Sequence, residues 1–395
     1  MTLWMRHNLE QKTYNKFRIN HLEQWHKDLL VLWLIMVLTM TAFGSVFPFL
    51  PLYLLKLEEM HPEQASLWGG IITGTASSLM IISAPIWGTL GGRIGRKRTI
   101  VIGLFGFAGV LLSASLAPNI YVLTPTWILF GVLPGPGMIT LAFISDIVPK
   151  QRLTYAVGLL TSANFIGFAI GPLVGGKFVD QLGFRSILIV AGALLILSGS
   201  IVLIKIGSVV TVSNRSELNN PLRVYQDAFK LVKTHHFNTT LPVLFIVQLV
   251  GCLLMPVIPI FIREISRVEE AGWLAGVAFG IMGITGGIAS ILTSKLQRTM
   301  SPKTSIYLCL VCMAILYTII VLTDSLIVIY INLGFVGICN GIMGTIAFSL
   351  IGQSSNVDSG RAYGLSHSIS AVAWGAGPII GGLAANYLGL RDVFV

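Results

Sequence analysis

One stretch of the sequence occurs twice, and this repetition constrains the fold more than any other feature. Residues 158–185 read GLLTSANFIGFAIGPLVGGKFVDQLGFR, and residues 364–391 read GLSHSISAVAWGAGPIIGGLAANYLGLR. The copies align without a gap at a shift of 206 positions, which places Gly171-Pro172 over Gly377-Pro378. The chain therefore contains a duplicated unit, and each half should follow the same plan.

The first copy has the pattern of a closely packed helix that flexes. Glycines at four-residue intervals place small residues on one face, so that another helix can approach closely. The proline removes a backbone hydrogen bond and bends the helix. The alternative is a merely kinked buried helix, which the matched second copy disfavours. We expect this pattern to control helix movement through Gly167, Gly171, Pro172, Gly175, Gly176, Gly377 and Pro378.

Composition assigns the repeated unit to a membrane. Hydrophobic residues make up 54% of the chain and charged residues 11%, against about 25% charged in a soluble domain. The first apolar run is too long for a signal-peptide core and is followed by no small-residue cleavage site. We expect an all-α polytopic protein with spans of about 20 or more residues at 29–55, 66–90, 98–117, 120–145, 153–178, 184–206, 237–263, 271–294, 304–323, 325–353 and 362–387.

The spans divide the chain into four parts. Residues 1–28 form a basic cytoplasmic tail, which either lies at the headgroups or is disordered. Residues 29–206 form an N-terminal six-helix bundle, and residues 237–395 form a C-terminal bundle of five spans plus the start of a sixth. Residues 207–236 form a cytoplasmic linker, in which Asn220-Pro221 predicts the start of a surface helix. We expect the last helix to be truncated, because its counterpart continues to about Lys205.

The net charge of +10 is explained by loops and not by nucleic-acid binding. With a cytoplasmic N-terminus, most Lys and Arg residues fall on the inner side, as the positive-inside rule requires. We therefore expect a multi-pass protein of the cytoplasmic membrane, in contact with its lipids. The basic residues that fall outside are Lys56, Lys177, Arg185, Arg263, Arg267 and Arg391.

The sequence offers no enzyme chemistry. All four cysteines lie in apolar runs, which predicts neither a disulfide framework nor a metal site. No glycine-rich loop is followed by Lys-Ser/Thr, so bound nucleotide is not expected. We expect no catalytic residue, no cofactor and a monomer.

Three motifs resemble those of the major facilitator superfamily, in particular its twelve-span drug:proton antiporter branch. They are the glycine-rich basic segment Gly88–Arg98, the segment Gly167–Gly176 with the sequence GFAIGPLVGG, and Asp146–Pro149 at the inner end of span four. The resemblance implies two pseudo-symmetric six-helix bundles that rock about a central site. It implies export of lipophilic compounds by alternating access, with protons as the coupling ion.

Two positions depart from the family pattern. Gly92 stands where the first motif normally has an acidic residue, and Trp127 stands where span four commonly has an arginine implicated in proton coupling. These departures leave open a receptor or scaffold that no longer transports. Uptake or facilitated transport of a small metabolite is a further alternative, but polar solutes need several buried polar groups, and the spans offer few.

The candidate substrate site is an aromatic and thioether face in the first span. Its residues recur at three- and four-residue steps, which suits either a bulky apolar ligand or a packing or lipid-facing surface. They are Trp33, Met36, Met40, Phe43 and Phe47. The family arrangement would add Trp127, Met138, Gln248, Met255, Asn332 and Asn340, of which the amides could instead form interhelical hydrogen bonds.

The basic segment is the candidate gate. We expect Gly88 and Gly95 to shape it, and Arg93, Arg96 and Lys97 to face Asp146. The proposed pair would form when the cytoplasmic side is closed. The alternative is an exposed carboxylate, worth about 0 to 1 kcal/mol as a surface pair.

Overall fold

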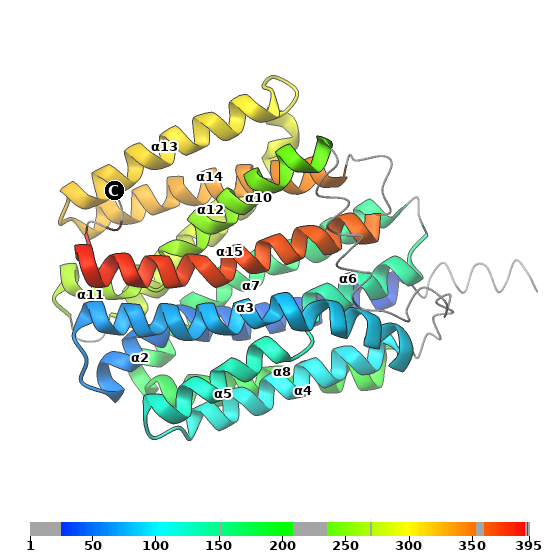
Figure 1. Ribbon diagram of the computed structural model, residues 1–395, viewed down its shortest axis with the longest axis horizontal. Helices are drawn as coiled ribbons and strands as arrows, with labels where there is room; N and C mark the ends of the chain where they lie inside the picture. The colour runs from blue at the N-terminus through cyan, green and yellow to red at the C-terminus, as the bar shows by residue number, and fades with distance from the viewer. Residues whose placement is uncertain are drawn as a thin grey trace, which may run out of the picture.

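The computed structural model describes residues 25–149, 152–207, 235–268, 271–352, 359–391 and 393. Every regular element in these ranges is helical (Figure 1). The described residues include 11 helical segments that are long and apolar enough to cross a membrane. The predicted class, an all-α polytopic membrane protein, is confirmed. Residues 1–24 of the expected tail and the expected surface helix lie outside the described residues, whereas residues 25–28, also assigned to the tail, begin the first helix.

The helices of the two halves follow one another in the same order. The first half consists of a helix at residues 25–46, η1 (Phe47–Phe49), α2 (Leu50–Leu57), α3 (Pro62–Ile94), α4 (Arg96–Ser115), α5 (Ile120–Val132), α6 (Pro136–Ile147), α7 (Leu153–Leu182) and α8 (Phe184–Lys205). The second half consists of α10 (His235–Leu253), α11 (Ile258–Ser266), α12 (Gly272–Leu296), α13 (Pro302–Leu322), α14 (Leu326–Gly352) and α15 (Ser359–Leu388).

Prolines decide where spans break. The first span is interrupted by the 3₁₀ turn at Pro48, and the equivalent span by a turn at residues 254–257. The predicted span at 120–145 is confirmed as Ile120–Ile144, but it consists of two helices. The break arises because Leu133 and Gly135 each precede a proline and are extended, with ψ of 156° and 119°. A residue before proline avoids the helical region. Pro172 and Pro378, in contrast, lie inside continuous helices.

Each half packs internally, and two helix pairs make most of the contact between the halves. Within the halves α4 packs on α8 and α12 on α14, while α3 packs on α15 and α7 on α12 between them. Figure 1 shows α3 and α15 side by side along most of their length. Side chains on the outer faces are apolar and exposed, such as Ile204 and Ile291, as expected for surfaces in contact with lipid.

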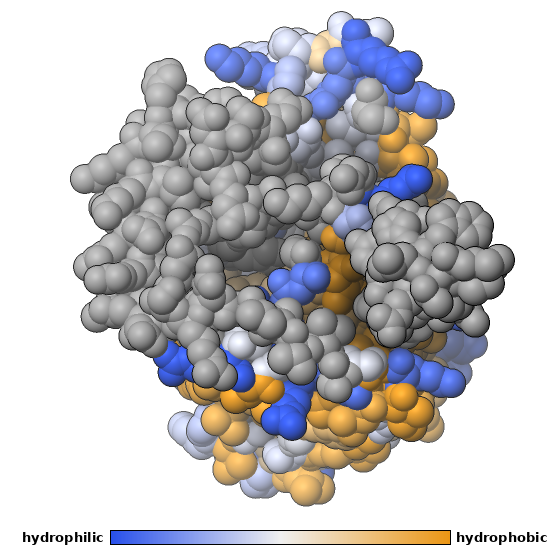
Figure 2. All heavy atoms as spheres, turned by 90° about the vertical axis from the view of Figure 1, so that its right-hand side faces the viewer, coloured by the Kyte–Doolittle hydropathy of each residue, from blue (hydrophilic) through white to orange (hydrophobic). Residues whose placement is uncertain are grey.

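The helices start and finish at two distinct ends of the molecule. We call the end that carries Arg96, Arg152 and Lys295 the basic end, and the end with residues 58–61, 183 and 389–391 the opposite end. Figure 2 views the molecule from the basic end, where hydrophilic side chains and exposed hydrophobic side chains lie among the described residues.

Candidate functional site: the interface between the two halves

The duplicated glycines make duplicated contacts within each half. A Cβ built on Gly171 would lie 2.7 Å from the Thr41 carbonyl oxygen, and one on Gly377 would lie 3.2 Å from the Leu249 carbonyl oxygen. Gly175 faces Ser45 in the first helix, as Gly381 faces Leu253 in α10. Each repeat therefore holds the first helix of its own half at backbone distance, and most side chains would push the two helices apart.

A second set of glycines brings the two halves together. Gly176 of α7 abuts the Gly272 carbonyl of α12, and Gly276 abuts the Pro172 carbonyl, so that neither position has room for a Cβ. On the other side of the molecule, a Cβ on Gly382 would lie 2.7 Å from the Ser66 carbonyl oxygen of α3. The segment Gly167–Gly176 thus has two contact faces. One faces the first helix of its own half, and the other faces α12 of the other half.

The contact between halves loosens toward the basic end. Along α7, Ala169 Cα would lie 3.0 Å from a Cβ on Gly283, and Phe165 Cβ would lie 3.6 Å from one on Gly287. A Cβ on Gly158, further along the same stripe, would meet nothing within 4 Å. Along the contact of α7 with α12, the helices are therefore packed at the opposite end and less tightly packed toward the basic end.

A carboxylate reinforces the packed end. Asp180 of α7 accepts hydrogen bonds from the backbone amides of Gly272, at 2.9 Å, and Trp273, at 2.6 Å. These amides lie at the N-terminus of α12, whose own N-cap residue, Ala271, supplies no side-chain cap. Unpaired amides and the helix dipole make such a terminus favourable for an anion. Asp180 thus caps a helix of the other half.

The aromatic part of the predicted substrate site packs within the first half. Phe43 contacts Phe107 and Phe130, and Phe47 contacts Trp127, with ring centroids 5.3 to 6.0 Å apart. Trp127 has no exposed surface and Met36 is 3% exposed. In this conformation these two residues support the fold and have almost no surface available to a ligand.

The remaining candidates are more varied. Trp33 donates its Nε1 proton to the Ser162 hydroxyl at 3.1 Å, which ties the first helix to α7. Asn332 is buried and donates to the Val328 carbonyl in its own helix. Eight of the predicted substrate-site residues are partly exposed, namely Trp33, Met40, Phe43, Phe47, Met138, Gln248, Met255 and Asn340.

The basic segment forms a sharper turn than expected. Gly88 and Arg93 lie inside α3, and α4 begins at Arg96, so only Gly95 interrupts the helices. Its φ of 98° suits glycine. Arg96 Nε lies 3.3 Å from Asp146 Oδ2, so the structure brings these two predicted residues together. Both belong to the first half, so rocking of the halves need not break their pair.

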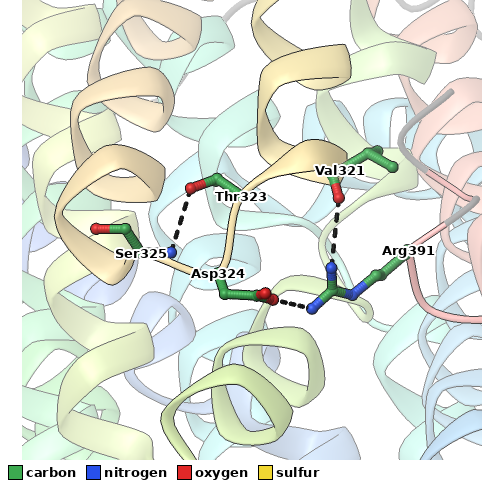
Figure 3. A network of polar contacts seen from close by, with 5 residues as sticks. All are labelled: Val321, Thr323, Asp324, Ser325 and Arg391. Carbon is green, nitrogen blue, oxygen red and sulfur yellow. Dashed lines mark hydrogen bonds and ion pairs between the residues drawn. The ribbon is translucent and has the colours of Figure 1, made fainter.

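Two features of the structure, a buried acid and a pair of helix-capping arginines, were not predicted from the sequence. Asp28 is 6% exposed within the first helix, although the predicted span started one residue later. The repeated arginines cap helix ends at the opposite end: Arg185 donates to the Ala117 carbonyl at 3.1 Å and Arg391 to the Val321 carbonyl at 3.4 Å. Figure 3 shows that Arg391 also pairs with Asp324. The repetition of arginine in both copies was the available signal.

Duplicated halves joined by close-packed helix pairs define a polytopic membrane protein with the architecture of a secondary transporter. The chain belongs to the Major Facilitator Superfamily, whose family model matches residues 32–378. It is thus a membrane transporter of that superfamily and not an enzyme.

Curated relatives and solved structures agree with this assignment. The chain is 27% identical over 379 residues to multidrug resistance protein MdtG of Escherichia fergusonii, covering 94% of this chain and 91% of the relative. It is 26% identical to the protein of the same name from a Rahnella species, covering 94% and 90%. The human organic anion transporter MFSD10 shares the fold with a TM-score of 0.69 at 16% identity, covering 94% and 96%. The nucleoside transporter NupG does so with a TM-score of 0.70 at 14% identity, covering 93% and 95%.

Proposed function

We propose that this transporter exports lipophilic, neutral or cationic compounds by alternating access, with protons as the coupling ion. The observation that carries the proposal is the scarcity of buried charge. Among the residues whose exposure the structure describes, Asp28 is the one charged side chain with less than a tenth of its surface exposed. Spans with so little buried charge suit apolar ligands better than sugars or nucleosides, whose lost hydration must be replaced. The names of the MdtG relatives support the same substrate class.

We assign the basic end to the cytoplasm, following the positive-inside rule. The packed opposite end then faces outward, and the conformation is inward-facing. The division into two bundles joined by the segment 207–236 is part of the same proposal.

Flux measurements test the proposal directly. Purified protein in proteoliposomes should transport ethidium, a planar lipophilic cation, and an imposed pH gradient should increase the flux several-fold. A panel containing a nucleoside and a pentose should show little transport. Uptake of those polar solutes instead would support the metabolite-carrier alternative. Absence of flux for every compound would favour a receptor or scaffold, which the residues Gly92 and Trp127 leave open.

We assign the coupling proton to Asp28 because of its burial in the first helix. Asp28→Asn should remove most of the effect of the pH gradient on ethidium flux while ethidium binding remains within about two-fold. Glu264→Gln, at an exposed acid in α11, is the control and should keep the pH response. An Asp28→Asn variant with the full pH response would rule out this assignment.

A further inference from the structure

Two aromatic residues that the predicted site does not include meet across the interface. The rings of Phe168 in α7 and Trp374 in α15 have centroids 6.2 Å apart and are tilted by 49°. The two helices belong to different halves, and each packs mainly on another helix, α7 on α12 and α15 on α3. The contact therefore bridges the space between the halves through side chains.

These residues are also counterparts in the repeat. Phe168 and Trp374 are separated by the same 206 positions that relate the two copies. Under a two-fold operation, a residue and its counterpart lie at equal distances from the axis, so they can touch only close to it. Phe168 and Trp374 also lie near the middle of their 30-residue helices. The pair thus marks the centre of the molecule, on the pseudo-two-fold axis and near mid-depth.

The pair Phe168–Trp374 lies at the inner limit of the close backbone contacts between the halves. Phe168 adjoins Ala169, which approaches Gly283 of α12, and Trp374 adjoins Gly375, which packs on Ser78 of α3. Toward the opposite end both helix pairs touch through backbone, whereas toward the basic end the contacts of α7 loosen. Both aromatic side chains remain partly exposed. A compound entering from the basic end would therefore reach them before it reached the close backbone contacts of the opposite end.

We propose that Phe168 and Trp374 form the inner wall of the substrate site and its central gate, and that their rings select planar aromatic compounds, cations included. Aromatic faces attract stacked rings and cations. This inference rests on the proposed function, because it assumes that a substrate enters between the halves. It adds the residues that select the substrate and the chemistry by which they do so.

The first experiment tests location without a substrate. In a variant with the four native cysteines replaced by alanine, Phe168→Cys and Trp374→Cys should each react with a membrane-impermeant thiol reagent applied from the basic end. Phe335→Cys, at an exposed site on α14, is the lipid-facing control and should react at least ten-fold more slowly. Lack of reaction of both central cysteines from either side would overturn the proposal.

The second experiment measures ethidium binding to the detergent-solubilised protein. The double variant Phe168→Ala, Trp374→Ala should bind ethidium about ten-fold more weakly, whereas the control Phe335→Ala should bind within about two-fold of the wild type. If the double variant does not fold, Phe168→Leu replaces it, with a loss of several-fold expected.

The outcomes separate this inference from the proposed function. If the wild type binds and transports ethidium and the double variant does so equally well, the proposed gate is overturned and the proposed efflux function is not. If the wild type transports non-planar lipophilic compounds but does not bind ethidium, the proposed selectivity for planar aromatic compounds is overturned and the proposed efflux function is not. Absence of flux for every compound would overturn both, even if the central cysteines react.

Discussion

Several glycines in this protein act through the absence of a side chain. Gly171 and Gly377 have no catalytic or ligand-binding group, yet each allows a helix to approach at backbone distance. At Gly95 and Gly183 the glycines serve differently, because their φ values of 98° and 79° suit a residue without a Cβ. The spacing of the glycines predicted close packing, but their partners became visible only in the structure.

We predict that Gly171→Leu or Gly377→Leu stops transport while the protein still inserts into the membrane. The added side chain would displace the first helix of its half, and overpacking of this kind costs typically 1–3 kcal/mol. Flux in proteoliposomes, together with the yield of folded protein, measures the effect. Gly158→Leu is the matched control on the same helix, since a Cβ there meets nothing within 4 Å. Flux equal to that of the wild type in a well-inserted Gly171→Leu variant would refute the prediction.

Helices in the two halves are equivalent in order but not in their capping. α3 begins at Pro62, several residues before Ser66 and Leu67, which contact Gly382. α12 begins at Gly272, directly at its contact with Gly176, so its first amides lie in the interface. The first repeat supplies Asp180 to these amides, and the second repeat has Asn386 at the equivalent position. The asymmetry places a charged cap on one of the two interfaces.

We predict that Asp180→Asn loosens the opposite end. An asparagine side chain replaces one of the two acceptor oxygens with an NH2 group, which cannot accept from a backbone amide, and it lacks the charge that favours a helix N-terminus. The loss is about 1 kcal/mol. Because 1.4 kcal/mol corresponds to a ten-fold change, labelling of a cysteine placed at Leu67 should increase about five-fold from the outer side. Gln181→Ala, at the next and exposed position, is the control. Unchanged labelling in Asp180→Asn would show that the cap does not hold the halves together.

At the scale of the whole molecule, alternating access requires the packed opposite end to open while the basic end closes. The contacts of α3 with α15 and of α7 with α12 are the ones that must change. The pair Arg96–Asp146 lies inside the first half, with side-chain exposures of 19% and 29%. Any influence it has on opening must therefore act by positioning the basic segment against the other half.

We predict that Asp146→Asn raises the accessibility of engineered cysteines in spans four and ten from the basic end and lowers efflux. The effect should be modest, because a partly exposed pair is worth about 0 to 1 kcal/mol. An Arg93→Ala, Arg96→Ala variant should add little once Asp146 is neutral, since both changes remove one interaction. Full additivity of the two sets of changes, or unchanged accessibility, would mean that Asp146 and the basic segment act independently.

The sequence alone determined the class, the duplication and the membrane spans, because each depends on local composition or on comparison of the chain with itself. Apolar runs of about 20 residues must cross a bilayer whatever surrounds them, and the shift of 206 positions is independent of folding. The break between α5 and α6 also has a local cause, since Pro134 and Pro136 keep the residues before them out of the helical region.

The tertiary structure decided which residues meet. Trp127 and Phe47, two predicted substrate-site residues, pack against each other, and Trp127 also packs against Phe130. A helical stripe of aromatic residues has the same sequence pattern whether it packs or binds a ligand. Phe168 and Trp374 are counterparts in the repeat, but the repeat does not show that they touch, and only the positions of the two halves place their ring centroids 6.2 Å apart. Contacts between residues far apart in sequence depend on how helices approach and rotate, which local hydrophobicity does not specify.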